Sequence, residues 1–186
     1  MLHNYAGHMT TEVDRLANFL GAVTVALHDR LVGSDGIAAL PPPADHPSAA
    51  ATLALLNWVP KMPQARLAYC VALSQPATVR LVDRLEDAGL VRRTRSLRRR
   101  QIWLESTSLG RTVASRLGFR RHEAMKLALA SLSRSEQARL GGLLEKLAFQ
   151  LLESKEHVMR VCRLCDARAC GADDDCPMWR AALAVV

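Results

Sequence analysis

The sequence is poor in aromatic residues and contains no long apolar run. Phe, Trp and Tyr make up 4% of the 186 residues, whereas Leu, Ala and Arg are abundant. Strands favour aromatic and β-branched residues, while Leu, Ala and Arg favour helices, so the composition predicts a mainly α protein. No uncharged apolar run reaches the ~18 residues of a membrane span, and no basic stretch leads into an apolar one at the N-terminus. We therefore expect a cytoplasmic protein with no membrane partner.

Motifs for catalysis are also lacking. The sequence has no Gly-rich phosphate loop, no paired acid and base, and no nucleophile motif. We therefore expect a protein that is not an enzyme, and we assign no catalytic residue.

Positive charge is concentrated in one short stretch. The net charge is +7, and Val91–Arg100 holds six arginines and no acid, so that the charge falls to +1 without them. Basic character confined to ten residues is typical of a nucleic-acid docking element. The alternative is a solvated charge run without a partner.

Apolar spacing and capping signals indicate short helices around a hairpin. Ser74 is a candidate N-cap with Pro76 in the first turn, and Gly89 follows as a natural C-terminal residue. Ser133 and Glu136 form a capping box for a last long helix. These signals predict helices over Thr10–Leu31, Ser48–Trp58, Gln64–Ala72, Gln75–Ala88, Ser108–Ala130 and Ser133 to about Arg160, and strands over Leu90–Arg93 and Gln101–Glu105.

This order predicts a winged helix-turn-helix with long terminal dimerisation helices and a two-stranded wing. We divide the chain into an N-terminal dimerisation helix and loop (1–47), a DNA-binding domain (48–107), C-terminal dimerisation helices (108–160) and a four-cysteine segment (161–186). The row of Leu143, Leu147 and Leu151, with Leu20 or Leu27, is expected to form the interface of a homodimer.

Two stretches carry a family resemblance. Leu73–Arg93 (LSQPATVRLVDRLEDAGLVRR) resembles the recognition helix and first wing strand of the multiple-antibiotic-resistance regulator (MarR) family, and Arg99–Arg111 (RRQIWLESTSLGR) resembles its wing and the start of its fifth helix. The resemblance implies a dimeric transcription regulator, usually a repressor, on palindromic double-stranded DNA. Arg98 stands where the family usually has an acid, and Ser106 where it usually has Leu.

The candidate DNA contacts lie on the predicted recognition helix and the wing. N-terminal side chains of such a helix reach base edges in the major groove, and wing arginines suit a narrow minor groove. Val79, Leu81, Val82 and Leu85 are expected to form the buried face. The alternative for Arg80 and Arg84 is pairing with Asp83, Glu86 or Asp87 on the same helix. The expected contacts are Ser74, Gln75, Ala77, Thr78, Arg80, Arg84, Arg95, Arg98, Arg99 and Arg100.

Four of the five cysteines crowd near the C-terminus. Cys162, Cys165, Cys170 and Cys176 fall within fifteen residues, whereas Cys70 lies alone on an apolar stretch and is expected to be a small buried side chain. Structural disulfides are disfavoured in a reducing cytoplasm, and thiolates are metal ligands. The cluster therefore predicts a metal centre, with a dithiol redox switch or no role as alternatives.

The spacing favours an iron–sulfur cluster over zinc. Structural zinc prefers two C-x2-C pairs, but here only the first pair has that form, and Pro177 follows the last cysteine as in many cluster motifs. The pattern is also similar to that of superoxide-sensing MerR-type activators, which implies a [2Fe–2S] cluster; zinc remains the alternative cofactor. We expect a regulator whose DNA affinity responds to this centre. The alternative is a repressor induced by a small aromatic ligand in the dimer pocket, with structural zinc at the cysteines.

Overall fold

The computed structural model describes residues 11–34, 36–95, 101–166, 170 and 176–184. It confirms a mainly helical winged-helix fold. The elements are α1 (Glu12–Val32), a 3-10 helix η1 (Ile37–Ala39), α2 (Pro47–Trp58), β1 (Met62–Pro63), α3 (Gln64–Cys70), α4 (Gln75–Asp87), β2 (Val91–Arg95), β3 (Ile102–Ser106), α5 (Ser108–Leu129), α6 (Arg134–Leu151), α7 (Lys155–Val161) and α8 (Pro177–Ala184).

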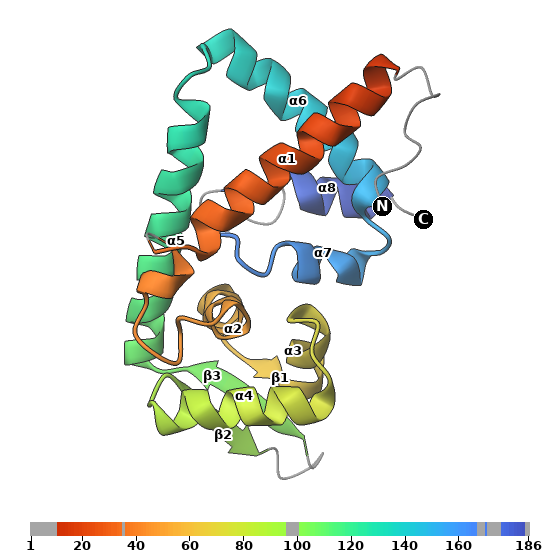
Figure 1. The fold of residues 1–186 in the computed structure, drawn as a ribbon. Coiled ribbons are helices and arrows are strands. Elements are labelled where there is room, and N and C mark those ends of the chain that lie inside the picture. Colours follow the sequence, from red (N-terminus) through yellow and green to blue (C-terminus); the bar gives the residue numbers. More distant parts are fainter. Residues whose placement is uncertain (1–10, 35, 96–100, 167–169, 171–175, 185–186) are drawn as a thin grey trace, which may run out of the picture.

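The winged-helix unit lies at one end of the molecule, below the long helices in Figure 1. Its core joins α2, α3, α4 and the sheet, with Leu53, Leu67, Leu81 and Leu104 at or below 1% exposure. Helix α2 is buried on all sides except its ends, which explains its almost uninterrupted apolar sequence. This central helix fixes the position of α4 and the wing.

The sheet has three antiparallel strands rather than the predicted two. Strand β3 lies in the middle, and its register pairs Val91 with Ser106 on one side and Met62 with Leu104 on the other. The sequence signal for β1 is hidden because the strand has two residues and one is Pro63, which edge strands tolerate.

Two local conformations shape the turns around the recognition helix. Gly89 has φ of +67° after α4, as its place at a helix end predicts. Ala72 has φ of +55°, and its N–H donates to the Tyr69 carbonyl, so α3 ends at Cys70 and not at Ala72 as predicted. The chain turns there because a left-handed residue cannot continue the helix.

The predicted last long helix is interrupted, which corrects its expected extent. Leu152 is extended, with ψ of 124°, and Ser154 caps a separate helix α7 by accepting a hydrogen bond from the His157 N–H. Helix α7 turns back and packs against α3 and α8, while α8, which the sequence analysis did not predict, packs against α6. Residues 155–160 therefore belong to the separate helix α7 and do not continue α6.

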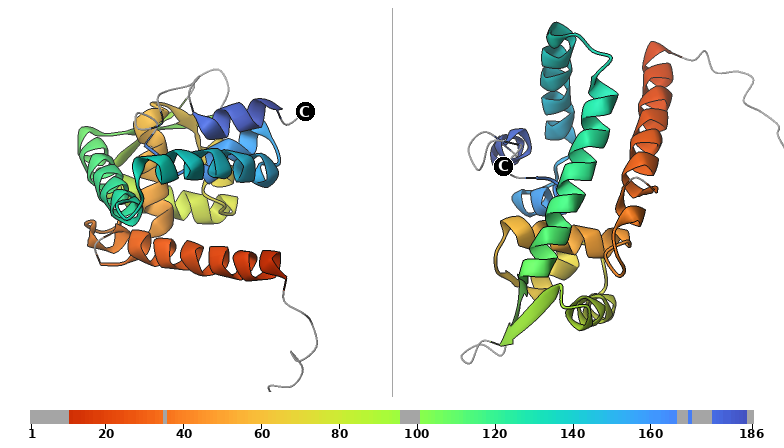
Figure 2. Two further views of the ribbon diagram at one scale, coloured as in Figure 1. Left: turned by 90° about the horizontal axis from the view of Figure 1, so that it is seen from above. Right: turned by 90° about the vertical axis from the view of Figure 1, so that its left-hand side faces the viewer.

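The three long helices are unevenly covered. Figure 2 shows α1 running along one side of the molecule, apart from α6. Helix α1 has no buried residue and contacts α5 and η1.

Among the described residues, no helix has the length and apolar character needed to cross a membrane.

Candidate nucleic-acid interface and cysteine cluster

Helix α4 and its N-cap hold six of the ten predicted contact residues. Ser74 caps the helix, and its hydroxyl accepts a hydrogen bond from the Ala77 N–H at 3.3 Å. Gln75, Arg80 and Arg84 are exposed, while Ala77 is half-buried. The capped end and these side chains therefore lie on the outer surface of the winged-helix unit.

Thr78 is the exception, and its predicted exposure is wrong. Its side chain is fully buried, and its hydroxyl donates to the Ser74 carbonyl oxygen at 3.0 Å. Thr78 shares the spacing of Leu81, Val82 and Leu85, so it belongs to the inner face of the helix. Val79, which was expected to be buried, is 41% exposed. That spacing is visible in the sequence and predicts burial of Thr78, although threonine is polar.

Arg93 binds two of the acids, Asp83 and Glu86, that were the alternative partners of Arg80 and Arg84. Its guanidinium donates to Glu86 and Asp83, each at 2.6 Å, and its backbone N–H donates to Glu86 at 2.9 Å. The Arg93 side chain is only 21% exposed. Burial opposes its charge, but Asp83 and Glu86 outweigh burial and raise the pKa of Arg93. Strand β2 is thereby fastened to the recognition helix.

Arg80 and Arg84, the two arginines of α4, have no acidic partner in the part of the chain that the structure describes. None of its ion pairs involves Arg80 or Arg84. Arg95 is exposed at the end of β2. The predicted wing-tip contacts lie outside the described residues: Arg98, Arg99 and Arg100.

A groove beside α4 adds residues that sequence reasoning missed. Arg80 and Arg84 line it together with His46 and Ser48 at the start of α2. The His46 ring accepts a hydrogen bond from the Ser48 N–H at 3.3 Å. The first turn of α2 therefore adjoins the exposed arginines, a proximity that only the packing of α2 on α4 creates.

The base of the wing carries a second ion-pair group. Glu105 on β3 accepts from Arg92 at 2.9 Å and pairs with Lys61 at 3.2 Å, and hydrogen bonds from these two residues, Arg92 foremost, lower the pKa of Glu105. Lys61 also lies 5.9 Å from the centre of the Trp103 ring. These contacts join β2, β3 and Lys61, the residue before β1, through their side chains.

Two of the four C-terminal cysteines, Cys162 and Cys165, belong to or pack against a second, smaller core. Cys162 is 6% exposed and packs with Ala148, Leu152, Val158, Ala181 and Ala182, with Cys165 and Met178 against them. Cys70 is fully buried in the main core instead, and burial raises the pKa of its thiol, in agreement with the expected packing role.

Electrostatic interactions connect the four C-terminal thiols. A hydrogen bond between Cys162 and Cys165 raises the pKa of Cys162 and lowers that of Cys165 to about 6. Burial raises the pKa of Cys170, and charges on Cys165 and Cys176 add to this effect. Arg121 on α5 donates to the Cys165 sulfur at 3.8 Å.

The arrangement of these thiols does not form a ready metal site. Over the described ranges, no group of three or more His, Cys, Asp or Glu side chains is placed to hold a metal ion. The soft sulfur donors nevertheless match the ligand chemistry of zinc and iron–sulfur centres.

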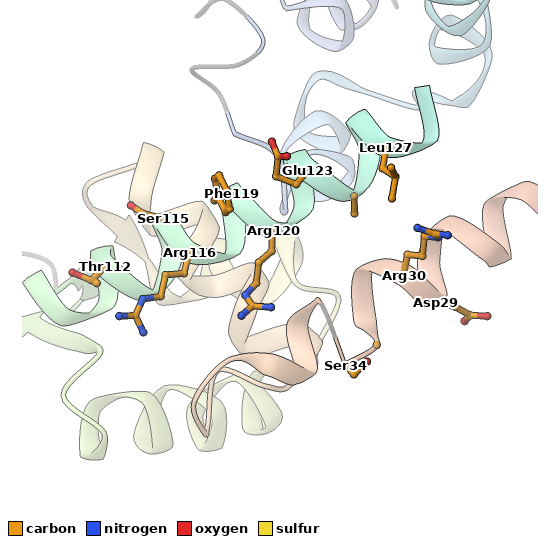
Figure 3. A pocket seen from close by; sticks show the side chains of 12 residues that line it. Asp29, Arg30, Ser34, Thr112, Ser115, Arg116, Phe119, Arg120, Glu123 and Leu127 are labelled. Atoms are coloured by element: carbon orange, nitrogen blue, oxygen red, sulfur yellow. The ribbon is translucent and has the colours of Figure 1, made fainter. Parts of the chain in front are cut away.

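A large open cavity of about 1470 Å³ lies between the end of α1 and α5. Figure 3 shows Arg116 and Arg120 extending from α5 along the cavity, with Arg30 on α1 facing Leu127. Phe119 supplies an aromatic surface, and Glu123 is the acid on α5. The lining thus combines guanidinium groups with apolar side chains.

The fold and the exposed recognition helix define a winged-helix protein. Residues 47–100 match the model of the MarR family. No curated protein matches the chain.

Solved structures share the fold over most of the chain. A MarR family protein from Bacillus stearothermophilus is 23% identical, with a TM-score of 0.65, over 75% of this chain and 94% of that one. A probable transcriptional regulator from Pseudomonas aeruginosa is 26% identical, with a TM-score of 0.53, over 72% and 99%. A mutant of MarR from E. coli, complexed with operator DNA, is 19% identical, with a TM-score of 0.54, over 76% and 99%. These similarities, with the family match over residues 47–100, show that the chain shares the winged-helix fold of MarR family proteins.

Proposed function

We propose that this protein is a sequence-specific DNA-binding transcriptional regulator that represses through a palindromic operator as a homodimer. The observation that carries the proposal is that two acids of α4 are bound by another residue while the arginines of the helix stay exposed. Arg93 binds Asp83 and Glu86, while Arg80 and Arg84 are exposed and form no ion pair within the described residues. The similar fold of the E. coli protein complexed with operator DNA supports the same use of α4.

Each predicted contact except the buried Thr78 has a role in this proposal. Gln75 and Arg80 read base edges, because a helix entering the major groove brings its N-terminal side chains to them. Ser74, Ala77 and Arg84 approach the phosphates beside the groove. Arg95 and the wing-tip Arg98, Arg99 and Arg100 lie over the minor groove, whose negative potential attracts guanidinium groups.

Dimer formation is supported by the apolar side chains left exposed on the terminal helices. On α1, Val13, Leu16 and Phe19 are each at least 64% exposed, and on α6 Leu143 and Leu151 are 57% and 69% exposed. Large apolar side chains left exposed along a helix are typical of an interface. We expect sedimentation to show a dimer, and Leu147→Asp to give a folded monomer.

DNA binding is tested by selecting bound duplexes from a randomised pool with the full-length protein. A selected palindrome is the expected result. Arg80→Ala should then weaken discrimination at one position of each half-site, while Arg139→Ala, on the exposed surface of α6, should bind as the wild type does. Failure to enrich any sequence would contradict the proposal.

We further propose that the four C-terminal cysteines bind a metal centre that modulates DNA affinity. Support comes from the electrostatic coupling of Cys162 to the other three thiols and from the Arg121 guanidinium, which favours negative charge on Cys165. A [2Fe–2S] cluster is the preferred centre and zinc the alternative.

Anaerobic purification followed by metal analysis and visible absorbance tests this centre. An iron–sulfur protein absorbs in the visible, whereas a zinc protein is colourless and loses stability with a chelator. Cys165→Ser should lose most of the metal, and Cys70→Ser should retain it. Finding neither iron nor zinc would reject the metal centre and favour a dithiol switch.

The cavity between α1 and α5 favours a second candidate, induction by a small aromatic anion. The residues that line it include Phe119, Arg30 and Arg116, and these types of side chain suit an aromatic carboxylate or phenolate. Salicylate is a practical probe. Loss of operator binding on its addition, abolished by Arg116→Gln, would favour this mode of control.

A further inference from the structure

Helix α7 has apolar side chains in two separate cores. Met159, 7% exposed, belongs to the winged-helix core, whereas Val158 and Cys162 belong to the cysteine-containing core. Val158 and Cys162 lie one turn apart on the same face, and Met159 lies about 100° further around the helix. One short helix is therefore buried on two sides.

The neighbours of α7 extend this arrangement toward the DNA-binding surface. Helix α7 packs against α8 on one side and α3 on the other, and α3 packs against the recognition helix α4. Figure 1 shows α7 between α8 and the winged-helix unit. A continuous series of packed helices thus joins the cysteines to α4 within one protomer.

The segment after α7 makes a second contact between the cysteines and the winged-helix unit. Leu164, two residues after Cys162, packs against the winged-helix core, and Arg121 of α5 donates to the Cys165 sulfur. Helix α5 begins at the end of β3, where the Thr107 hydroxyl accepts from the Gly110 N–H. The cysteine segment therefore contacts the winged-helix unit at α3 and also the helix that continues from its wing.

We infer that Met159 is a positioning residue through which the four-cysteine segment controls the helix-turn-helix of its own protomer. The inference rests on the proposed regulatory function of the cysteines. A helix of seven residues is unstable alone, so α7 depends on the contacts at both its faces. When the cysteine core loosens, Val158 and Cys162 lose their partners, Met159 withdraws from the winged-helix core, and α3 loses support next to α4.

Hydrogen exchange on the full-length protein tests the connection. Ala182 is fully buried in the cysteine core, and Leu183 beside it is 54% exposed. Ala182→Asp should raise amide exchange in α8, α7 and α3 by about tenfold, since local opening exposes these amides together. Leu183→Asp is the matched control and should leave α3 unchanged. Exchange in the first half of α5 should stay at its wild-type value, which distinguishes local opening from global unfolding.

A second variant tests Met159 itself. Met159→Ala should raise exchange in α3 while the metal content stays unchanged, and adding Ala182→Asp should raise α3 exchange no further. Val161→Ala, a truncation of a 42% exposed side chain on the same helix, should resemble the wild type. Met159→Leu should restore α3 protection.

The outcomes separate this inference from the proposed function. If Ala182→Asp loosens α8 but leaves α3 protected, or if Met159→Ala leaves α3 unchanged, the inference is wrong even when metal is bound. If metal analysis finds no metal but α3 responds to Ala182→Asp, the connection stands and the metal centre fails. If the connection stands and neither variant changes affinity for the selected duplex, the regulatory role fails.

Discussion

The ion pairs of Arg93 give the sharpest test of the DNA-binding surface. Arg93→Gln removes the cation that both Asp83 and Glu86 bind and leaves two carboxylates beside the expected phosphate path. Asp83 also lies three residues from Arg80, a spacing at which the two side chains can pair. We therefore expect the variant to expose negative charge to the DNA and to capture Arg80 within α4.

The magnitude follows from the exposure of these groups. Hydrogen bonds to charged groups contribute about 1.5–3 kcal/mol when buried, but exposed pairs contribute about 1 kcal/mol or less. Asp83 and Glu86 are 50% and 38% exposed, so solvent screening reduces their contribution. We expect a loss of about 1–2 kcal/mol in the free energy of unfolding.

Arg93→Gln should also change the salt dependence of DNA binding, which a loss of stability alone would leave unchanged. Removing one interaction between a cationic side chain and a phosphate lowers the slope of log affinity against log salt by about 0.9. Arg93→Gln should therefore lower the slope by about 1–2 and weaken binding by about ten- to a hundredfold at low salt. Fluorescence anisotropy over a salt series measures both quantities, and urea unfolding measures the stability.

Rescue distinguishes an electrostatic effect from a structural one. Adding Asp83→Asn and Glu86→Gln to Arg93→Gln should recover most of the salt slope, because the uncompensated carboxylates are gone. Arg93→Lys keeps the charge but loses part of the hydrogen bonding, and should fall between the wild type and Arg93→Gln. An Arg93→Gln protein with reduced stability and the wild-type salt slope would refute the reasoning.

Three further results are expected. Arg80→Ala should lose about 1–3 kcal/mol of discrimination between the selected duplex and a single-base variant, measured by competition binding. Ser133→Ala should lower the free energy of unfolding by roughly 1 kcal/mol at neutral pH. Hydrogen bonds from Ser133 lower the pKa of Glu136, so the part of the capping that uses the Glu136 carboxylate is present above the ordinary pKa of a glutamate and is lost as the pH falls through the lowered value. Gly110→Ala should destabilise the protein by roughly 3 kcal/mol, because its Cβ would lie 2.0 Å from a backbone carbonyl oxygen, whereas Gly118→Ala on the same helix meets nothing and should stabilise it by about 0.5–1 kcal/mol in thermal unfolding. Equal effects of the two glycine substitutions would contradict this reading.

Local sequence signals determined most of the elements. Caps at Ser74 and Ser133 and the glycine after α4 act within a few residues, so their consequences can be read directly from the chain. The ends of β2 and β3 were predicted to within two residues. The same holds for α4 before the wing and α5 after it. The candidate DNA surface followed from the same signals, apart from Thr78, whose apolar spacing was a better guide than its hydroxyl.

Only the tertiary structure decided which distant residues meet. Arg93 binds Asp83 from another element, and Arg121 reaches Cys165 across 44 positions of sequence. The break at Leu152, which lets α7 turn back onto α3, has no strong local signal such as proline or glycine. It occurs because α7 buries Met159 in one core and Val158 in another, a gain that depends on surfaces formed by other parts of the chain.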